Sequence, residues 1–267
     1  MRWWRKAHTP MTEKEKLFKV GVSDFSEIPN LRRIFDHHWN DSSELVVIGE
    51  LSAERVSELT GGLVKNKISL TVNRLLAPGN YDLILIFGAT VPHEVAGFAG
   101  GAKYFFPGVA GAALTHATHW LSALATVEKI IGRIETPTRH LIEAAADFIA
   151  AEVVSFTSVV SRDDDRLRTH ALFARDFRAA LRKAAEVSRR VHIKYTGRKY
   201  KRVVALLDEH YDELWVGGKA SYRLGAIIEE GGELFIYAPH LRCLSVTHGE
   251  FIKKFGGYAP LEKITEF

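Results

Sequence analysis

Short apolar runs alternate with amphipathic helical patterns along most of this 267-residue chain. That alternation is typical of an α/β architecture with largely parallel sheets, because parallel strands need a crossover helix between them. We therefore expect an α/β fold of two lobes, each a largely parallel sheet flanked by helices. The runs expected to form strands are 45–49, 68–72, 83–88, 153–160, 202–207, 213–216 and 233–238.

Three helical segments and one boundary follow from local signals. Thr12 and Glu15 form a capping box, which predicts a helix beginning at about Glu13. Apolar residues at helical spacing predict two further helices, over 139–153 and 176–190. The polar stretch 135–138 is the best candidate for a boundary, because the chain after it can form its own strands and helices. We expect two domains, 1–137 with the cofactor-binding and catalytic residues and 138–267 as a C-terminal α/β domain.

Composition excludes several classes of protein. The net charge of +4 and the 46% hydrophobic content fit a globular protein and give little reason to expect nucleic acid as a partner. The segment 182–202 holds nine Lys or Arg against one acid, but no nucleic-acid motif accompanies it, so a solvated helix face is the preferred interpretation. A single cysteine, Cys243, and no membrane-length apolar run favour the cytoplasm and no membrane partner.

Most of the chemistry lies in residues 90–108, directly after the expected strand 83–88. Ligand sites in open α/β sheets gather at the carboxyl ends of strands, which is where this segment falls. Gly97, Gly100 and Gly101 would let backbone amides approach an anion closely. Tyr104 follows Lys103 where a phosphate-binding loop for nucleoside triphosphates needs Ser or Thr, so that class of site is not expected.

Four side chains in or near this segment could carry chemistry, and for Lys103 and His93 a structural interpretation stands beside the chemical one. Lys103 stands among apolar residues that would favour its neutral, nucleophilic form, or it is a lysine extending past a buried aromatic cluster. His93 is a general acid or base, or a hydrogen-bonded loop histidine. His116 and His119 lie three residues apart on an expected helix, and either imidazole could bind a transition metal.

Taken together, these residues resemble the nickel-pincer lactate racemase family. The signature is a Pro-His pair, a Gly-Phe-x-Gly-Gly-x-Lys loop with Phe98 as its aromatic residue, a Pro-Gly and a later histidine. Lys103 follows His93 by ten residues and precedes His119 by sixteen. The likeness extends over nearly the whole chain, through segments 8–13, 72–76, 215–219, 230–234, 237–240 and 247–249.

The resemblance implies an active site in a cleft between the two lobes and a role for each matching residue. A nickel pincer nucleotide would be attached covalently to Lys103, and His119 would be the protein ligand to nickel. His8 and His93 would form the acid and base pair, while Lys219 would reach toward cofactor or substrate. The loop residues Gly97, Phe98, Gly100 and Gly101 would lie against the cofactor. The implied reaction is racemisation or epimerisation of a 2-hydroxy acid by hydride removal and return through a 2-keto acid.

One family element has no counterpart here: no Asp-x-Thr-Arg sequence occurs in the chain. In the family this element precedes the His8 segment and holds substrate carboxylate and cofactor phosphate, so its absence puts activity in question. Two functions therefore remain open. One is the racemase or epimerase, with the pincer-synthesis and insertion proteins and a separate N-terminal polypeptide as expected partners. The other is an N-terminally truncated, non-catalytic relative that binds an anionic metabolite or a partner.

Overall fold

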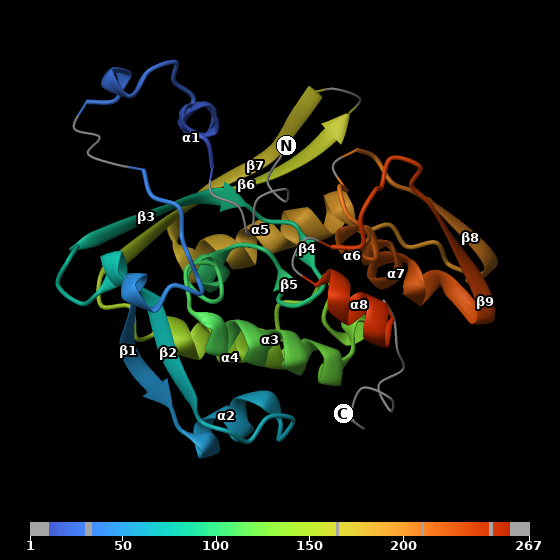
Figure 1. Ribbon diagram of the computed structural model, residues 1–267, viewed down its shortest axis with the longest axis horizontal. Helices are drawn as coiled ribbons and strands as arrows, with labels where there is room; N and C mark the ends of the chain where they lie inside the picture. Colours follow the sequence, from blue (N-terminus) through green and yellow to red (C-terminus); the bar gives the residue numbers. More distant parts are fainter. Residues whose placement is uncertain (1–10, 30–33, 164–165, 210, 246–247, 257–267) are drawn as a thin grey trace.

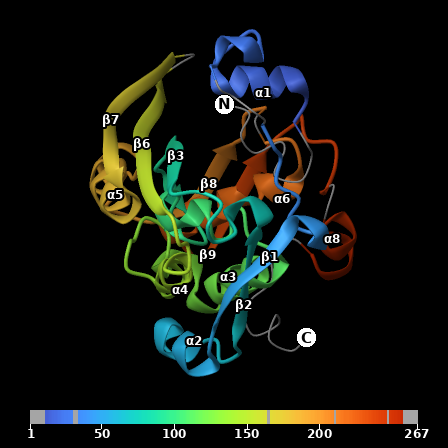
Figure 2. The ribbon, with the colours of Figure 1, turned by 90° about the vertical axis from the view of Figure 1, so that its left-hand side faces the viewer.

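The computed structural model describes residues 11–29, 34–163, 166–209, 211–245 and 248–256 as a mixed α/β fold. Figures 1 and 2 show β1 and β2 at one end of the molecule, β8 and β9 at the other, and the α3, α4 and α5 helices between them. None of the helices in these ranges is long and apolar enough to span a membrane.

The helices begin and end as follows: α1 Glu13–Val20, α2 Ala53–Thr60, α3 Ala112–Ala125, α4 Pro137–Ala146, α5 Phe177–His192, α6 Leu214–Gly217, α7 Lys219–Leu224 and α8 Gly249–Phe255. The capping box at Thr12 and Glu15 is present, and α1 begins at Glu13 as the sequence predicts. The α5 helix begins after Asp176, whose carboxylate accepts the amides of Arg178 and Ala179.

The strands are β1 Leu45–Leu51, β2 Ile68–Asn73, β3 Leu83–Ala89, β4 Pro92–His93, β5 Gly97–Phe98, β6 Glu152–Asp163, β7 Arg166–Asp176, β8 Tyr200–Leu206 and β9 Ile228–Tyr237. The β3 and β6 strands pair in parallel, as do β8 and β9. The pairs β1–β2, β4–β5 and β6–β7 are antiparallel. The expected α/β class is therefore confirmed, and its sheets combine parallel and antiparallel pairs.

The sheet of order β3-β6-β7 positions the functional loop. The α5 helix packs on β6 and β7, and the α4 helix packs on α2 and α3. Ile86 of β3 and Val153 of β6 point into the main core, where they join apolar side chains of β2, α3 and α4. On the opposite face of β3, Leu83 and Leu85 are each 49% exposed, so this sheet has one covered and one open face among the described residues.

Two expectations from the sequence are wrong in their local structure. Residues 214–217 form α6 in place of a strand, because a run of four apolar residues carries no periodicity that separates strand from helix. The helix expected over 139–153 ends at Ala146, and β6 begins at Glu152. The other six expected strands are confirmed.

The pairing of β3 with β6 also bears on the expected division at residues 137 and 138. Because β6 and β7 belong to the same sheet as β3, that boundary lies between strands of one sheet. The two-domain division stays a prediction, and so does a cleft between two lobes.

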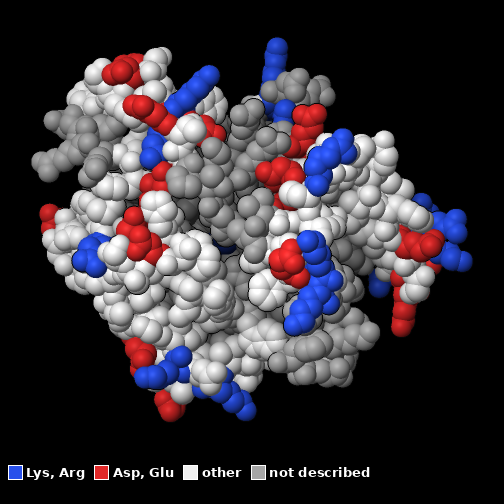
Figure 3. Space-filling model, viewed as in Figure 1, with Lys and Arg blue, Asp and Glu red and all other residues white. Residues whose placement is uncertain are grey.

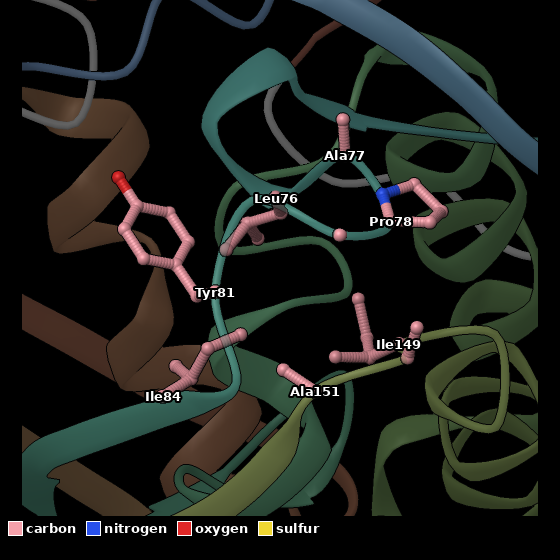
Figure 4. Close-up of a pocket in the computed structure, with 9 residues that line it drawn as sticks. Leu76, Ala77, Pro78, Tyr81, Ile84, Ile149 and Ala151 are labelled. Atoms are coloured by element: carbon pink, nitrogen blue, oxygen red, sulfur yellow. The ribbon is translucent and has the colours of Figure 1, made fainter.

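A small apolar pocket lies at the amino ends of β3 and β6 (Figure 4). Ile84, Tyr81 and Ile149 are among the side chains that line it, and its cavity volume is about 10 Å³. That volume holds about one water molecule. The pocket is therefore too small for an organic ligand and lies at the opposite end of β3 from residues 90–108.

Candidate active site

The site begins where β3 ends. After Ala89 the chain forms a two-stranded turn in which Pro92 of β4 pairs with Phe98 of β5 and His93 pairs with Gly97. A 3-10 helix, Gly101–Tyr104, follows directly and carries Lys103. The predicted position at the carboxyl end of β3 therefore applies to His93 and Lys103 together.

Glycine is required in this turn because other chain segments lie against it. Gly97 has φ +76°, and a Cβ there would lie 1.8 Å from the carbonyl oxygen of Arg133. The Gly97 carbonyl also accepts the amide of Gly132 at 2.9 Å. Phe98 is fully buried and packs on Leu181 of α5. The loop is therefore a packed part of the interior, with a fixed conformation.

His93 is buried, and its Nδ1 accepts the backbone amide of Val95 at 3.0 Å. Because Nδ1 is an acceptor, the neutral ring carries its proton on Nε2. Burial, followed by the positive charge of Lys103, moves the pKa of His93 well below 6.5. His93 is therefore a neutral imidazole that presents an Nε2–H donor near neutral pH.

Lys103 is part-buried beside the same loop. Burial, followed by the positive charge of Arg139, lowers the pKa of its amine from 10.5 to about 8. At pH 8 about half of such amines are neutral, and a neutral amine is a nucleophile. The lowered pKa of Lys103 is therefore the effect that we expected from its apolar neighbours in the sequence.

Glu94 and Lys219 form an ion pair across the site, with 2.5 Å between Oε1 and Nζ. The two side chains are only 10% and 12% exposed. Burial opposes ionisation of Glu94, but the adjacent positive charge outweighs it and holds the carboxyl pKa below its ordinary value of 4.5. Burial lowers the pKa of Lys219, and Glu94 counters part of that shift.

His119 lies on α3 with its Nδ1 2.7 Å from the carbonyl oxygen of Thr115. A carbonyl only accepts, so Nδ1 carries the proton and Nε2 keeps its lone pair for a proton or a metal. His119 is exposed at the surface, yet the protein atoms around it lower its pKa, and the charges of Lys103, Glu94 and Lys219 also act on it. His119 therefore belongs to the same group of side chains.

His116 does not join His119. Its ring lies edge-on to Trp39, with 6.3 Å between the ring centroids. Across the described ranges, no group of three His, Cys, Asp or Glu side chains is placed to hold a metal ion. Any metal here would need ligands besides His119. His8, the other predicted catalytic histidine, falls outside the described residues.

Two buried residues of the site were missed by sequence reasoning. Glu94 had a signal, since it follows His93 in a loop already singled out. Arg139 directly follows the polar stretch 135–138 that we took for a boundary, and its side chain is 2% exposed. It donates to the carbonyl oxygens of Ala96, Phe98 and Gly100. Only the three-dimensional structure brings it to the glycine loop.

The surface elsewhere gives little sign of a large charged ligand. On the face in Figure 3, the charged side chains lie in scattered groups, in most of which basic side chains lie next to acidic ones. Several basic residues of the 182–202 segment pair with carboxylates, as Arg182 does with Glu135 and Arg202 with Glu233. These contacts are consistent with a solvated helix face.

Comparison with known proteins agrees with the resemblance read from the sequence. Residues 6–131 match the family described as the lactate racemase N-terminal domain. A crystal structure of a Thermotoga maritima protein, determined by a structural genomics consortium, has 31% identity and a TM-score of 0.83 over 96% of this chain and 62% of its own. The lactate racemase apoprotein of Thermoanaerobacterium thermosaccharolyticum has 19% identity and a TM-score of 0.66 over 86% of this chain and 50% of its own. At 19% identity, the second match is a likeness of fold.

The chain thus spans less than two thirds of the length of either structure. None of the curated proteins matches it. The family match covers the glycine loop, His93, Lys103 and His119, and the structural matches extend across most of the remaining chain. Residues 6–131 therefore match the lactate racemase N-terminal domain, and the fold of the chain resembles that of a lactate racemase.

Proposed function

We propose that the protein is a nickel-pincer-dependent racemase or epimerase of a 2-hydroxy acid. One observation carries the proposal: His93, Lys103, His119 and the Glu94–Lys219 pair form one electrostatically coupled group at the end of β3. Their charges act on one another although the residues come from three distant parts of the chain. Packing of the protein interior does not by itself require these ionisable side chains to lie close together.

The first test of fit concerns the covalent link. A lysine joins a carbonyl or thiocarbonyl carbon only as the neutral amine, and the pKa of Lys103 at about 8 makes that form available near neutral pH. Lys103 also lies directly after the glycine loop, where a flat ring system could approach the backbone closely. Lys103 therefore fits the role of cofactor attachment.

The second test concerns the metal. Nickel accepts imidazole ligands, and the Nδ1–H of His119 is already directed to Thr115, which leaves Nε2 available. One imidazole is too few to hold a metal ion by protein groups alone. His119 therefore fits as a single protein ligand to a metal whose other ligands come with the cofactor.

The third test concerns charge. Lys103, Lys219 and Arg139 are three basic groups of the site, of which Lys219 pairs with Glu94 and Arg139 with Glu143. A basic group beside a partly desolvated site stabilises an anionic ligand. A nucleotide phosphate and a hydroxy acid carboxylate are both suitable ligands. We propose that the backbone amides of the glycine loop lie against the cofactor, at Gly97, Gly100 and Gly101.

When bound, the nickel pincer nucleotide supplies the carbon that accepts and returns the substrate hydride. The remaining steps belong to the protein. We assign proton transfer to His8 and His93. His93 presents Nε2–H, so it donates a hydrogen bond to the substrate oxygen. To accept a proton at Nε2, His93 must first move its own proton to Nδ1, which breaks the hydrogen bond from Val95.

The proposal is tested by co-expression with the proteins that build and insert the pincer cofactor. We expect wild-type protein to gain a cofactor-sized mass and bound nickel, and Lys103→Ala to gain neither. Lys67→Ala is the matched control, because Lys67 is 70% exposed and pairs only with Glu50 at the surface. Loaded protein is then screened for racemisation of 2-hydroxy acids by chiral chromatography.

The alternative is a non-catalytic member of the family that binds an anionic metabolite or a partner. A chain that stays unmodified under conditions that load a longer relative, yet binds 2-hydroxy acids, would favour this alternative. Loading that appears only when a separate N-terminal polypeptide is added would favour a two-chain enzyme.

A further inference from the structure

Arg139 is the largest side chain that is almost fully buried in the described structure, and its contacts go mainly to one loop. Its Nη2 donates to the carbonyl oxygens of Ala96, at 2.9 Å, and Phe98. Its Nη1 donates to the carbonyl oxygen of Gly100 at 3.3 Å. A single guanidinium therefore binds three alternate carbonyl groups of residues 96–100.

The third of these carbonyl groups connects Arg139 to Lys103. The Gly100 oxygen accepts Nη1 of Arg139 and also the backbone amide of Lys103, at 3.4 Å. Gly100 has φ +105° and Gly101 has φ +61°, so the chain changes direction sharply between the loop and Lys103. By holding the Gly100 carbonyl group in place, Arg139 therefore also determines where the 3-10 helix with Lys103 begins.

Arg139 is itself held in place from its own helix. Its amide donates to Oγ1 of Thr136, which caps α4, and Nη1 lies 3.5 Å from Oε1 of Glu143 one turn later. Arg178 of α5 donates to the other oxygen of Glu143 at 2.9 Å. The guanidinium is thus anchored to α4 and α5, both of which pack near the 3-10 helix.

We propose that Arg139 is a positioning residue that sets the conformation of the 96–100 loop and thereby directs Lys103 into the site. Its importance for catalysis rests on the proposed function, but its effect on the loop does not. Only an arginine has a planar fork of donors that can serve three carbonyl groups at once. Lysine, with one ammonium group, would retain the charge and lose most of these bonds.

The charge of Arg139 has a separate effect from its geometry. Burial is the largest cause of the lowered pKa of Lys103, and the positive charge of Arg139 is the second largest. Glu94 and Lys219 also act on Lys103, and His93 and His119 belong to the same group. A substitution that keeps the charge and one that removes it should therefore differ in the reactivity of Lys103.

Hydrogen–deuterium exchange of the protein without cofactor tests the proposal. In Arg139→Lys we expect the amides of residues 96–103 to exchange at least ten-fold faster than in wild type, with β1 and β2 unchanged. The matched control is Arg178→Lys, since Arg178 also binds Glu143 but touches none of the loop carbonyls. We expect that control to leave exchange in residues 96–103 at the wild-type rate.

A second readout separates positioning from general stabilisation. The pH midpoint of Lys103 acylation should stay near the wild-type value in Arg139→Lys and rise in Arg139→Gln, which removes the charge. Equal loop exchange in Arg139→Lys and Arg178→Lys would overturn the proposal, as would a uniform increase over all segments. Both measurements use protein without cofactor, so they test the role of Arg139 even if the cofactor cannot be loaded. A negative result in either would overturn the role of Arg139 and leave the proposed racemase reaction to be tested by cofactor loading.

Discussion

Oε1 of Glu94 lies 2.5 Å from Nζ of Lys219, and this ion pair joins the loop after β4 to the first residue of α7. Both side chains are nearly buried, so neither charge is compensated by water. A buried ion pair is seldom worth much relative to an apolar pair, but removal of one member leaves the other unpaired. Glu94 is therefore expected to matter for stability and for the position of Lys219.

Glu94→Gln should destabilise the protein by about 3 to 5 kcal/mol, because it removes the carboxylate that pairs with the nearly buried Lys219 ammonium. Urea unfolding followed by circular dichroism measures the change. Glu58→Gln is the control, since Glu58 pairs with Arg55 while 70% exposed, and such surface pairs are worth less than about 1 kcal/mol. Equal losses of stability from the two substitutions would contradict a buried ion pair between Glu94 and Lys219.

The same ion pair predicts how the stability difference between wild type and Glu94→Gln depends on pH. The folded state holds the Glu94 pKa below 4.5, so the pair stabilises the protein fully above that pH and loses its contribution as pH falls further. We expect the stability gap between wild type and Glu94→Gln to narrow below pH 4.5. A gap that stays constant from pH 6 to pH 3 would argue against an ionised Glu94.

The functional loop was predictable from the sequence because its signals are local. A strand-sized apolar run precedes it, and its glycines, His93 and Lys103 lie within about twenty residues of that run. The capping box of α1 and the start of α5 were predictable for the same reason. The residues that complete the site come from elsewhere, and no local pattern pairs Arg139 with Gly100 or Glu94 with Lys219.

The β7 strand shows a second limit. Its sequence, Arg166–Asp176, is rich in charged residues and mostly exposed, and its apolar run is confined to residues 171–174. It forms because it continues the hairpin from β6, with Val154 paired to Asp176 and Phe156 to Ala174. The expected domain boundary was placed on polarity alone, although Thr136 and Thr138 of that polar stretch are buried.

Gly97→Ala should destabilise the protein by about 3 kcal/mol or more. The φ of +76° disfavours any side chain, and the added Cβ would strike the Arg133 carbonyl. Gly61→Ala provides the control, since Gly61 has φ +63° but nothing within 4 Å of the added atom. That control should cost only about 1 to 2 kcal/mol. Thermal and urea unfolding compare the two, and a larger effect at Gly61 would contradict the packing described for the loop.

His93 should make the protein less stable in mild acid. Its pKa is lowered in the folded state, so the unfolded chain takes up a proton near pH 6.5 and the folded chain does not. Stability should therefore fall by up to about 1.4 kcal/mol per pH unit below pH 6.5 from this group. His93→Gln should reduce that slope. Unfolding curves of wild type and variant from pH 7.5 to pH 5 measure both slopes.

Lys103 should react with acetic anhydride at an unusually low pH. With a pKa of about 8, half of its amines are neutral at pH 8, whereas a lysine with an ordinary pKa of 10.5 is about 0.3% neutral there. The midpoint of the labelling profile, read by peptide mass spectrometry, is the informative quantity because it is independent of how accessible the amine is. Lys67 serves as an internal reference at the surface. A midpoint for Lys103 at or above pH 10 would show that burial and Arg139 leave the amine charged, and Lys103 would then lose its suitability for covalent attachment near neutral pH.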